Sequence, residues 1–183
     1  IAPRAPPSIP IAPGVQFTIG PPRILKATYK SVKVYWNPER FLLELEGVIN
    51  DVAEALKIIR VSFNKLGYPL KKTCHYYEIS LDPQPLDIKN FVTNLRNKIK
   101  LEVKINNESL KPFSITFSNV DEPISREKFY KWLHITVNPD VNAPQARVLI
   151  GIIKREVDVG RTIEFLLNIK DIINKIRIFF TKH

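Results

Sequence analysis

Proline is concentrated at the start of this 183-residue chain, where roughly half of its fifteen prolines lie in residues 1–22, IAPRAPPSIPIAPGVQFTIGPP. Proline fixes φ and has no amide hydrogen, so a proline-dense stretch is extended and does not pack as helix or sheet. We therefore expect residues 1–27 to form an extended arm, with a disordered tail as the alternative. Because residues 1–37 contain no acidic residue, we treat them together as an extended, Pro-rich basic arm.

The charge balance restricts the partners. The chain has 28 Lys+Arg against 18 Asp+Glu, a net charge of +10, which favours phosphate backbones or anionic membrane surfaces. No apolar run is long enough to predict a membrane span. Cys74 is the only cysteine, which excludes an internal disulfide and favours a reducing intracellular compartment. The chain starts at Ile1 without a methionine, and its acid-free start is typical of a processed organellar targeting segment or of a basic arm lying on RNA.

A long amphipathic helix is expected after the arm, over residues 38–66 of a segment 38–70. Asn37 is a suitable N-cap, and Pro38 then takes the first helical position, where a missing amide hydrogen costs nothing. Gly67 and Pro69 end the periodic pattern. The apolar residues that recur at spacings of three and four, on one face, are Leu45, Val48, Ile49, Val52, Leu56, Ile59 and Phe63.

Residues 75–167 predict short strands and shorter helices. Alternating apolar residues indicate strands over 75–81, 101–105, 113–117, 132–137 and 161–167, and helical spacing indicates helices over 88–99 and 142–153. This order predicts an α+β domain, a ferredoxin-like split β-α-β sandwich with an antiparallel or mixed sheet and two helices on one face. Residues 168–183 predict a closing C-terminal helix and tail.

Catalytic motifs find no support in the sequence. His134-Ile-Thr136 is similar to one half of a paired His-x-Thr phosphoesterase site, but neither His75 nor His183 supplies the second half. One cysteine and three dispersed histidines give no metal-ligand spacing, and six glycines form no phosphate-binding loop. We expect no catalytic residue, no metal site, no cofactor and no small-molecule substrate.

Basic residues interleaved with aromatics do predict an interface. Lysine and arginine neutralise phosphates, and exposed aromatic rings stack on unpaired bases. The alternative is a solvated sheet face with one core aromatic. The predicted RNA-binding residues are Arg4, Arg23, Lys26, Lys30, Lys33, Lys98, Lys100, Lys104, Lys111, Arg126, Lys128, Tyr130, Lys131, Trp132 and His134.

The run S-R-E-K-F at 125–129, followed by the strand K-W-L-H-I-T-V-N-P, resembles the small-subunit ribosomal protein ten family. Two departures, an arm with only S-L-K-P at 109–112 and a shortened stretch from Ser125 to Pro139, resemble its mitochondrial members or a large-subunit mitochondrial relative. The resemblance implies a structural constituent of the mitochondrial ribosome, small subunit favoured, in the mitochondrial matrix. It also implies binding of ribosomal RNA and neighbouring ribosomal proteins through an arm at 106–131, with Arg126 and Lys128 matching the family's motif.

Two other functions compete with the ribosomal one. The first is a stand-alone nucleic-acid-binding protein, archaeal or viral, which would explain the same basic and aromatic residues. The second is a protein-interaction adaptor that docks a partner on the apolar helix face of residues 45–63. Charge distribution favours RNA binding over both a solvated surface and an enzyme.

Overall fold

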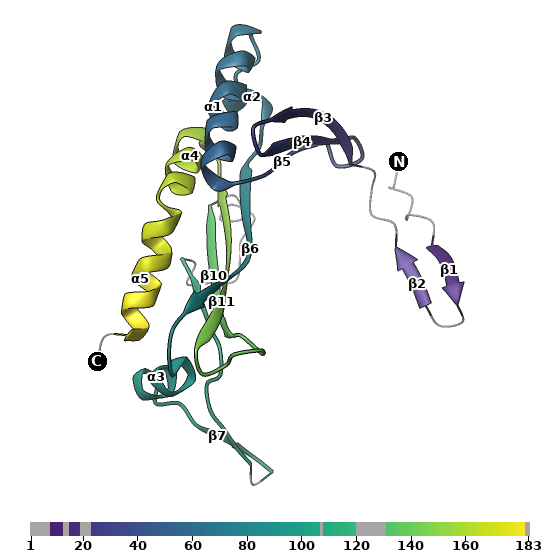
Figure 1. The fold of residues 1–183 in the computed structure, drawn as a ribbon. Helices are drawn as coiled ribbons and strands as arrows, with labels where there is room; N and C mark the ends of the chain where they lie inside the picture. Colours follow the sequence, from purple (N-terminus) through teal and green to yellow (C-terminus); the bar gives the residue numbers. More distant parts are fainter. Residues whose placement is uncertain (1–7, 13–14, 19–22, 107, 120–130, 182–183) are drawn as a thin grey trace. The chain divides into compact units, whose positions relative to one another are not determined.

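The computed structural model describes residues 8–12, 15–18, 23–106, 108–119 and 131–181 (Figure 1). The protein is α+β as predicted, and its described strands pair in antiparallel sheets. The chain divides into two compact units, Ile1–Ile59 and Arg60–His183, and each is described by itself.

The first unit contains strands where the sequence predicted an extended arm. β1 (Ser8–Ala12) and β2 (Val15–Thr18) form an antiparallel hairpin. A two-stranded hairpin has only edge strands, where a proline such as Pro10 is tolerated. β3 (Ile24–Tyr29), β4 (Val32–Asn37) and β5 (Leu42–Glu46) form an antiparallel sheet in that order. The prediction of an extended arm that does not pair is wrong for these strands. β1 and β2 pair as edge strands despite their prolines, and β3 and β4 follow Pro22 in a stretch rich in β-branched and aromatic side chains.

The long helix of the first unit begins later than predicted. α1 spans Ile49–Lys65, and its turns from Arg60 onward belong to the second unit. Residues 38–41 form instead the turn between β4 and β5, in which the Asn37 carboxamide oxygen accepts the Arg40 amide hydrogen at 3.1 Å. An N-cap makes the same type of bond, which is why the sequence signal was misleading. The predicted end is confirmed, since Gly67 follows the helix with a φ of 81°.

The second unit is built on a four-stranded antiparallel sheet. Its strands are β6 (Tyr77–Asp87), β9 (Ile115–Ser118), β10 (Trp132–Pro139) and β11 (Arg147–Glu156), in the order β6-β11-β10-β9. The predicted alternation of residues 75–81 and 132–137 is confirmed by the burial patterns of β6 and β10. A separate hairpin pairs β7 (Val103–Ile105) with β8 (Glu108–Leu110).

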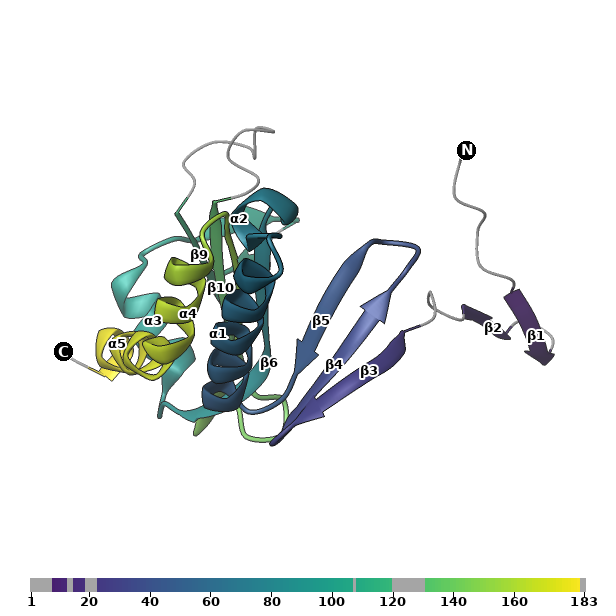
Figure 2. The ribbon, with the colours of Figure 1, turned by 90° about the horizontal axis from the view of Figure 1, so that it is seen from above.

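Three helices of this unit lie on one face of the four-stranded sheet (Figure 2). They are α3 (Phe91–Lys98), α4 (Val159–Leu167) and α5 (Ile169–Thr181), while the short α2 (Leu70–Thr73) precedes β6. The core between helices and sheet is formed by fully or almost fully buried apolar side chains: Ile88, Phe91, Leu95, Ile135, Val137, Val148, Ile150, Ile152, Ile163, Leu166, Ile169, Ile176 and Phe180. None of the helices within the described ranges is long and apolar enough to cross a membrane.

Two predicted elements of this unit are wrong: a segment expected to be a helix is a strand, and a segment expected to be a strand is a helix. The expected helix over 142–153 is a turn followed by β11, whose β-branched residues Val148, Ile150 and Ile152 point to one face. The expected strand over 161–167 is α4, which begins where the Asp158 carboxylate accepts the Arg161 amide hydrogen at 2.9 Å. The ferredoxin-like split β-α-β arrangement is therefore not confirmed: β10 leads through this turn into β11, and both closing helices follow. The C-terminal helix is confirmed as α5.

Candidate nucleic-acid interface

The four-stranded sheet has one face without the buried apolar residues of the core. Side chains alternate across a strand, so the residues between the buried Ile135, Val137, Ile150 and Ile152 point to the opposite side. We call this side the open face. Its residues, matched through the strand register, are Thr116, Ser118, Trp132, His134, Thr136, Leu149, Gly151, Ile153, Arg155, Glu78 and Ser80.

Trp132 and His134 lie together on the open face, as predicted. They are two residues apart on β10, and their ring centroids are 5.1 Å apart with planes tilted by 49°. The Trp132 indole N–H donates to the Ser118 hydroxyl at 3.3 Å, which fixes the indole across to β9. These contacts leave two half-buried rings side by side on a rigid strand.

Arg155 completes this group of aromatic residues. Its register partner on β10 is Trp132, and its guanidinium carbon lies 5.1 Å from the Trp132 ring centroid and 5.7 Å from that of Tyr76. Its Nε donates to the Glu78 carboxylate on β6 at 2.5 Å. A guanidinium held between rings and a carboxylate is a planar, pre-oriented cation. Only 16% of its side chain is exposed.

The lysines that the sequence predicted as RNA ligands of this unit do not lie together on the open face. Lys131 is exposed and directly precedes Trp132. Lys98, in contrast, lies 5.3 Å from the Phe179 ring centroid of α5, on the helix-covered side. Lys111 approaches Glu102 at 3.9 Å, and Lys100 and Lys104 are exposed at the end of α3 and in β7. The structure therefore brings Trp132 and His134 together but does not gather the predicted lysines at them.

The basic residues of the first unit are partly engaged in ion pairs. Arg23 contacts Glu44 at 2.9 Å and Glu46 at 3.1 Å, and it lies over the Tyr35 ring. Lys26 and Lys33 are exposed. Arg23 is thus already engaged by two carboxylates. The exposed Lys26 and Lys33 are better placed to contact a phosphate.

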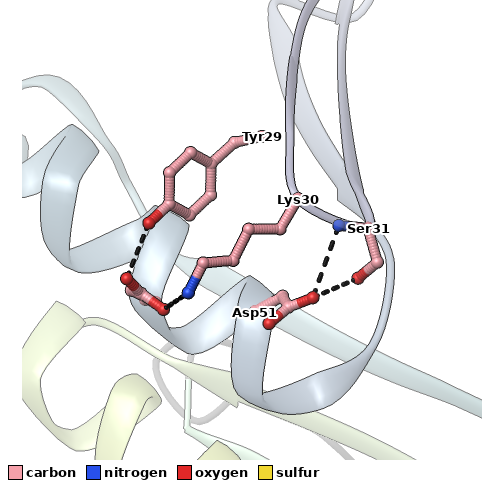
Figure 3. A network of polar contacts seen from close by, with 5 residues as sticks. Tyr29, Lys30, Ser31 and Asp51 are labelled. Atoms are coloured by element: carbon pink, nitrogen blue, oxygen red, sulfur yellow. Dashed lines mark hydrogen bonds and ion pairs between the residues drawn. The ribbon is translucent and has the colours of Figure 1, made fainter.

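Lys30 belongs to a polar network at the β3–β4 turn (Figure 3). The Glu54 carboxylate of α1 accepts from Lys30 at 2.5 Å and from the Tyr29 hydroxyl at 2.6 Å, and the Lys30 hydrogen bond, followed by that of Tyr29, lowers the pKa of Glu54. The same hydrogen bond to Glu54 raises the pKa of Lys30. Beside it, the Ser31 hydroxyl donates to Asp51 at 2.7 Å, and this bond lowers the pKa of Asp51. Lys30 therefore links the β3–β4 turn to α1, and its ammonium group is engaged by Glu54 rather than available to a phosphate.

Four predicted residues, Arg4, Arg126, Lys128 and Tyr130, lie outside the described residues. The open face was only half found from the sequence. Gly151 and Ile153 were missed because residues 142–153 were expected to be helical. Arg155 was missed because no strand was predicted at its position. The run V-L-I-G-I-I at 148–153 is apolar on both sides of the strand apart from Gly151, so no alternation in the sequence could have placed these residues.

A hollow lies where α4 begins. Its volume is about 420 Å³, and its lining includes Arg60, Asn64, Lys71, Asp158 and Gly160. The hydrogen bonds that Asp158 accepts, first from Arg161, lower its pKa, so a carboxylate already occupies this helix N-terminus. Within the described ranges, no group of three or more His, Cys, Asp or Glu is placed to hold a metal ion.

Comparisons with protein-family models, with curated proteins and with solved structures found no match. The function proposed below therefore rests on the chain's own residues. Among them, the open face brings the aromatic rings of Trp132 and His134 together with the hydroxyls of Thr116, Ser118 and Thr136.

Proposed function

We propose that this protein is a non-catalytic RNA-binding protein whose open face contacts unstacked RNA. The observation that carries the proposal is the grouping of three planar side chains, Trp132, His134 and Arg155, on one face of an antiparallel sheet. Every base has a π-face, so a fixed ring or guanidinium plane binds RNA without needing a particular sequence.

Charge supports the same conclusion. The net charge of +10 attracts a polyanion from a distance, and the exposed Lys131 stands beside Trp132. Glu78 neutralises part of the local charge but also fixes the guanidinium plane. We therefore assign base stacking to Trp132 and phosphate contacts to lysines such as Lys131. Arg155 would hold the Trp132 ring in its orientation.

The two tryptophans of the chain give a matched test. We would measure binding of a fluorescein-labelled single-stranded RNA ten-mer by anisotropy, comparing Trp132→Ala with Trp36→Ala. Removal of a stacking ring costs about 1–3 kcal/mol per base, so Trp132→Ala should weaken binding roughly five- to 150-fold. Trp36 lies on β4 in the other unit, and its removal should leave the affinity within about twofold.

Equal losses in the two variants would show that the open face has no special role. An unchanged affinity in Trp132→Ala would reduce Trp132 to a packing residue and overturn the proposal. Circular dichroism of both variants controls for folding. Affinity should also fall with added salt, because phosphate contacts release counterions.

The ribosomal role is the narrower form of the proposal, and it rests on the resemblance of residues 125–139 to the ribosomal family. In that form, the protein binds ribosomal RNA and neighbouring proteins of a mitochondrial ribosome. The test is sedimentation of the endogenous protein through a sucrose gradient with and without magnesium chelation. Co-migration with one subunit after the subunits separate supports this form, whereas a free monomer in magnesium leaves the stand-alone RNA-binding protein.

A further inference from the structure

We infer that Gly151 leaves a notch in the open face that admits one unpaired nucleobase. This inference rests on the proposed RNA-binding function and names the part of RNA that the surface accepts. Gly151 lies in the middle of β11, and its register partner on β10 is Thr136. Glycine inside a strand weakens the strand, and it often marks close approach of a ligand.

Backbone conformation does not explain this glycine. Among the described glycines only Gly67 has a positive φ, so Gly151 has a backbone that other residues can adopt. The pairing of β11 with β6 is irregular between Ile150 and Ile152, but such a bulge needs glycine only when φ is positive. What distinguishes Gly151 is therefore the missing side chain.

The space above Gly151 is nearly empty. A β-carbon built there would meet one atom within 4 Å, the Thr136 hydroxyl oxygen at 2.9 Å. That oxygen is the end of a rotatable side chain. The notch therefore has a hydroxyl on its β10 side and open space over the glycine itself.

Larger side chains enclose the notch along the strands. His134 and Ile153 are paired on one side of it, and Asn138 and Leu149 are paired on the other. Leu149 and Ile153 are four residues apart, about 13 Å along a strand, which leaves room for a single base between them.

Hydrogen-bonding groups surround the same position. On the neighbouring strand β9, Thr116 is the register partner of Thr136, and Ser118 is the register partner of His134. Hydroxyls both donate and accept, so they can bond to the edge of any base that is not already paired. In a duplex these edges are engaged and lie inside the helix, so the notch is suited to single-stranded RNA.

Filling the notch is the direct test. Gly151→Val adds a strand-favouring side chain without changing any charge, and Ala27→Val adds carbon atoms at an exposed position of β3 in the other unit, away from the open face. We would measure binding of a labelled uridine ten-mer and of a twelve-base-pair RNA duplex by anisotropy at several salt concentrations. Gly151→Val should weaken binding of the ten-mer about tenfold, leaving duplex binding and the salt slope unchanged. Ala27→Val should change each affinity less than twofold.

The possible failures are distinguishable. If the wild-type protein does not bind the ten-mer, the proposed function fails together with this inference. If the wild type binds and folded Gly151→Val binds equally well, only the notch is wrong. Should Gly151→Val fail to fold, Gly151→Ala decides: it adds one carbon against the Thr136 hydroxyl, and about a threefold loss is expected. No loss in folded Gly151→Ala would then overturn the inference.

Discussion

The two larger sheets of this protein follow the same antiparallel pairing rules, but they differ in what they bury. In β10 and β11, Val137, Val148 and Ile150 are completely buried beneath helices. In the β3-β4-β5 sheet only Val32 and Asn37 are buried, and Phe41 in the β4–β5 turn is 83% exposed. One sheet is stabilised mainly by packing, whereas the other depends on pairing, ion pairs and turn geometry.

This difference shows that strand pairing alone does not make a core. Each sheet has apolar side chains, but the helix-covered sheet removes many more of them from water, and burial is the main stabilising term. Substitutions of similar chemistry should therefore have unequal effects in the two units. The predictions below test this, beginning with the largest expected effect.

Phe91→Ala should destabilise the protein by about 3–5 kcal/mol, because a large buried ring leaves a cavity behind. Phe91 is fully buried, and its ring centroid lies 4.8 Å from that of Phe180. Phe41→Ala, the matched control in the exposed sheet, should change stability by less than about 0.5 kcal/mol. Urea unfolding followed by circular dichroism measures both values. A similar cost for the two variants would mean that the β3-β4-β5 sheet buries Phe41 against something in solution.

Phe41→Gly should raise stability by about 1 kcal/mol, since a left-handed conformation is costly for a residue with a β-carbon. Phe41 has a φ of 50°, and its only aromatic contact among the described residues is the edge of Trp36, 6.3 Å between centroids. A shift of the urea midpoint to higher concentration would confirm this. A loss of stability would show that the Trp36 contact outweighs the backbone strain.

Glu54→Gln should give the smallest effect, with a characteristic pH dependence. The pKa of Glu54 is lowered in the folded protein, so its stabilising contribution is present above the unfolded carboxyl pKa and is lost as pH falls through the folded value. The wild type should therefore exceed Glu54→Gln in stability at neutral pH, and the two should converge in acid. Urea midpoints measured from pH 2 to pH 8 check this. A difference that persists unchanged at pH 2 would exclude the ion pair as its cause.

The sequence predicted helices and strands best where the spacing of apolar residues fitted only one of the two. The alternation in β6 and β10 and the last turns of α1 were correct because no local signal competed with them. Asn37-Pro38 failed because a capping side chain and a turn-forming side chain make the same hydrogen bond, and only the strands on either side decide between them. The exchange of β11 and α4 had a similar origin, since Val148, Leu149, Ile152 and Ile153 satisfy a helical spacing as well as strand pairing.

In the candidate site, too, residues on a clearly patterned strand were predicted, and residues placed by long-range pairing were not. Trp132 and His134 were predicted because their strand was predicted. Arg155 lies opposite Trp132 only through the β10–β11 register, a long-range property that local pattern does not contain. Charge alone suggested Arg23 and Lys30, but their acidic partners come from other elements of the unit.

The strand order also has a consequence for how the chain folds. The nearest pair of β10 and β11, Pro139 and Val148, is nine positions apart, whereas the nearest pair of β6 and β11, Asp87 and Arg147, is sixty positions apart. Closing the longer loop costs more entropy and delays contact formation. We expect the β10–β11 hairpin to form first and β6 to be added late. The surface proposed to hold RNA would then be largely assembled before the sheet is complete.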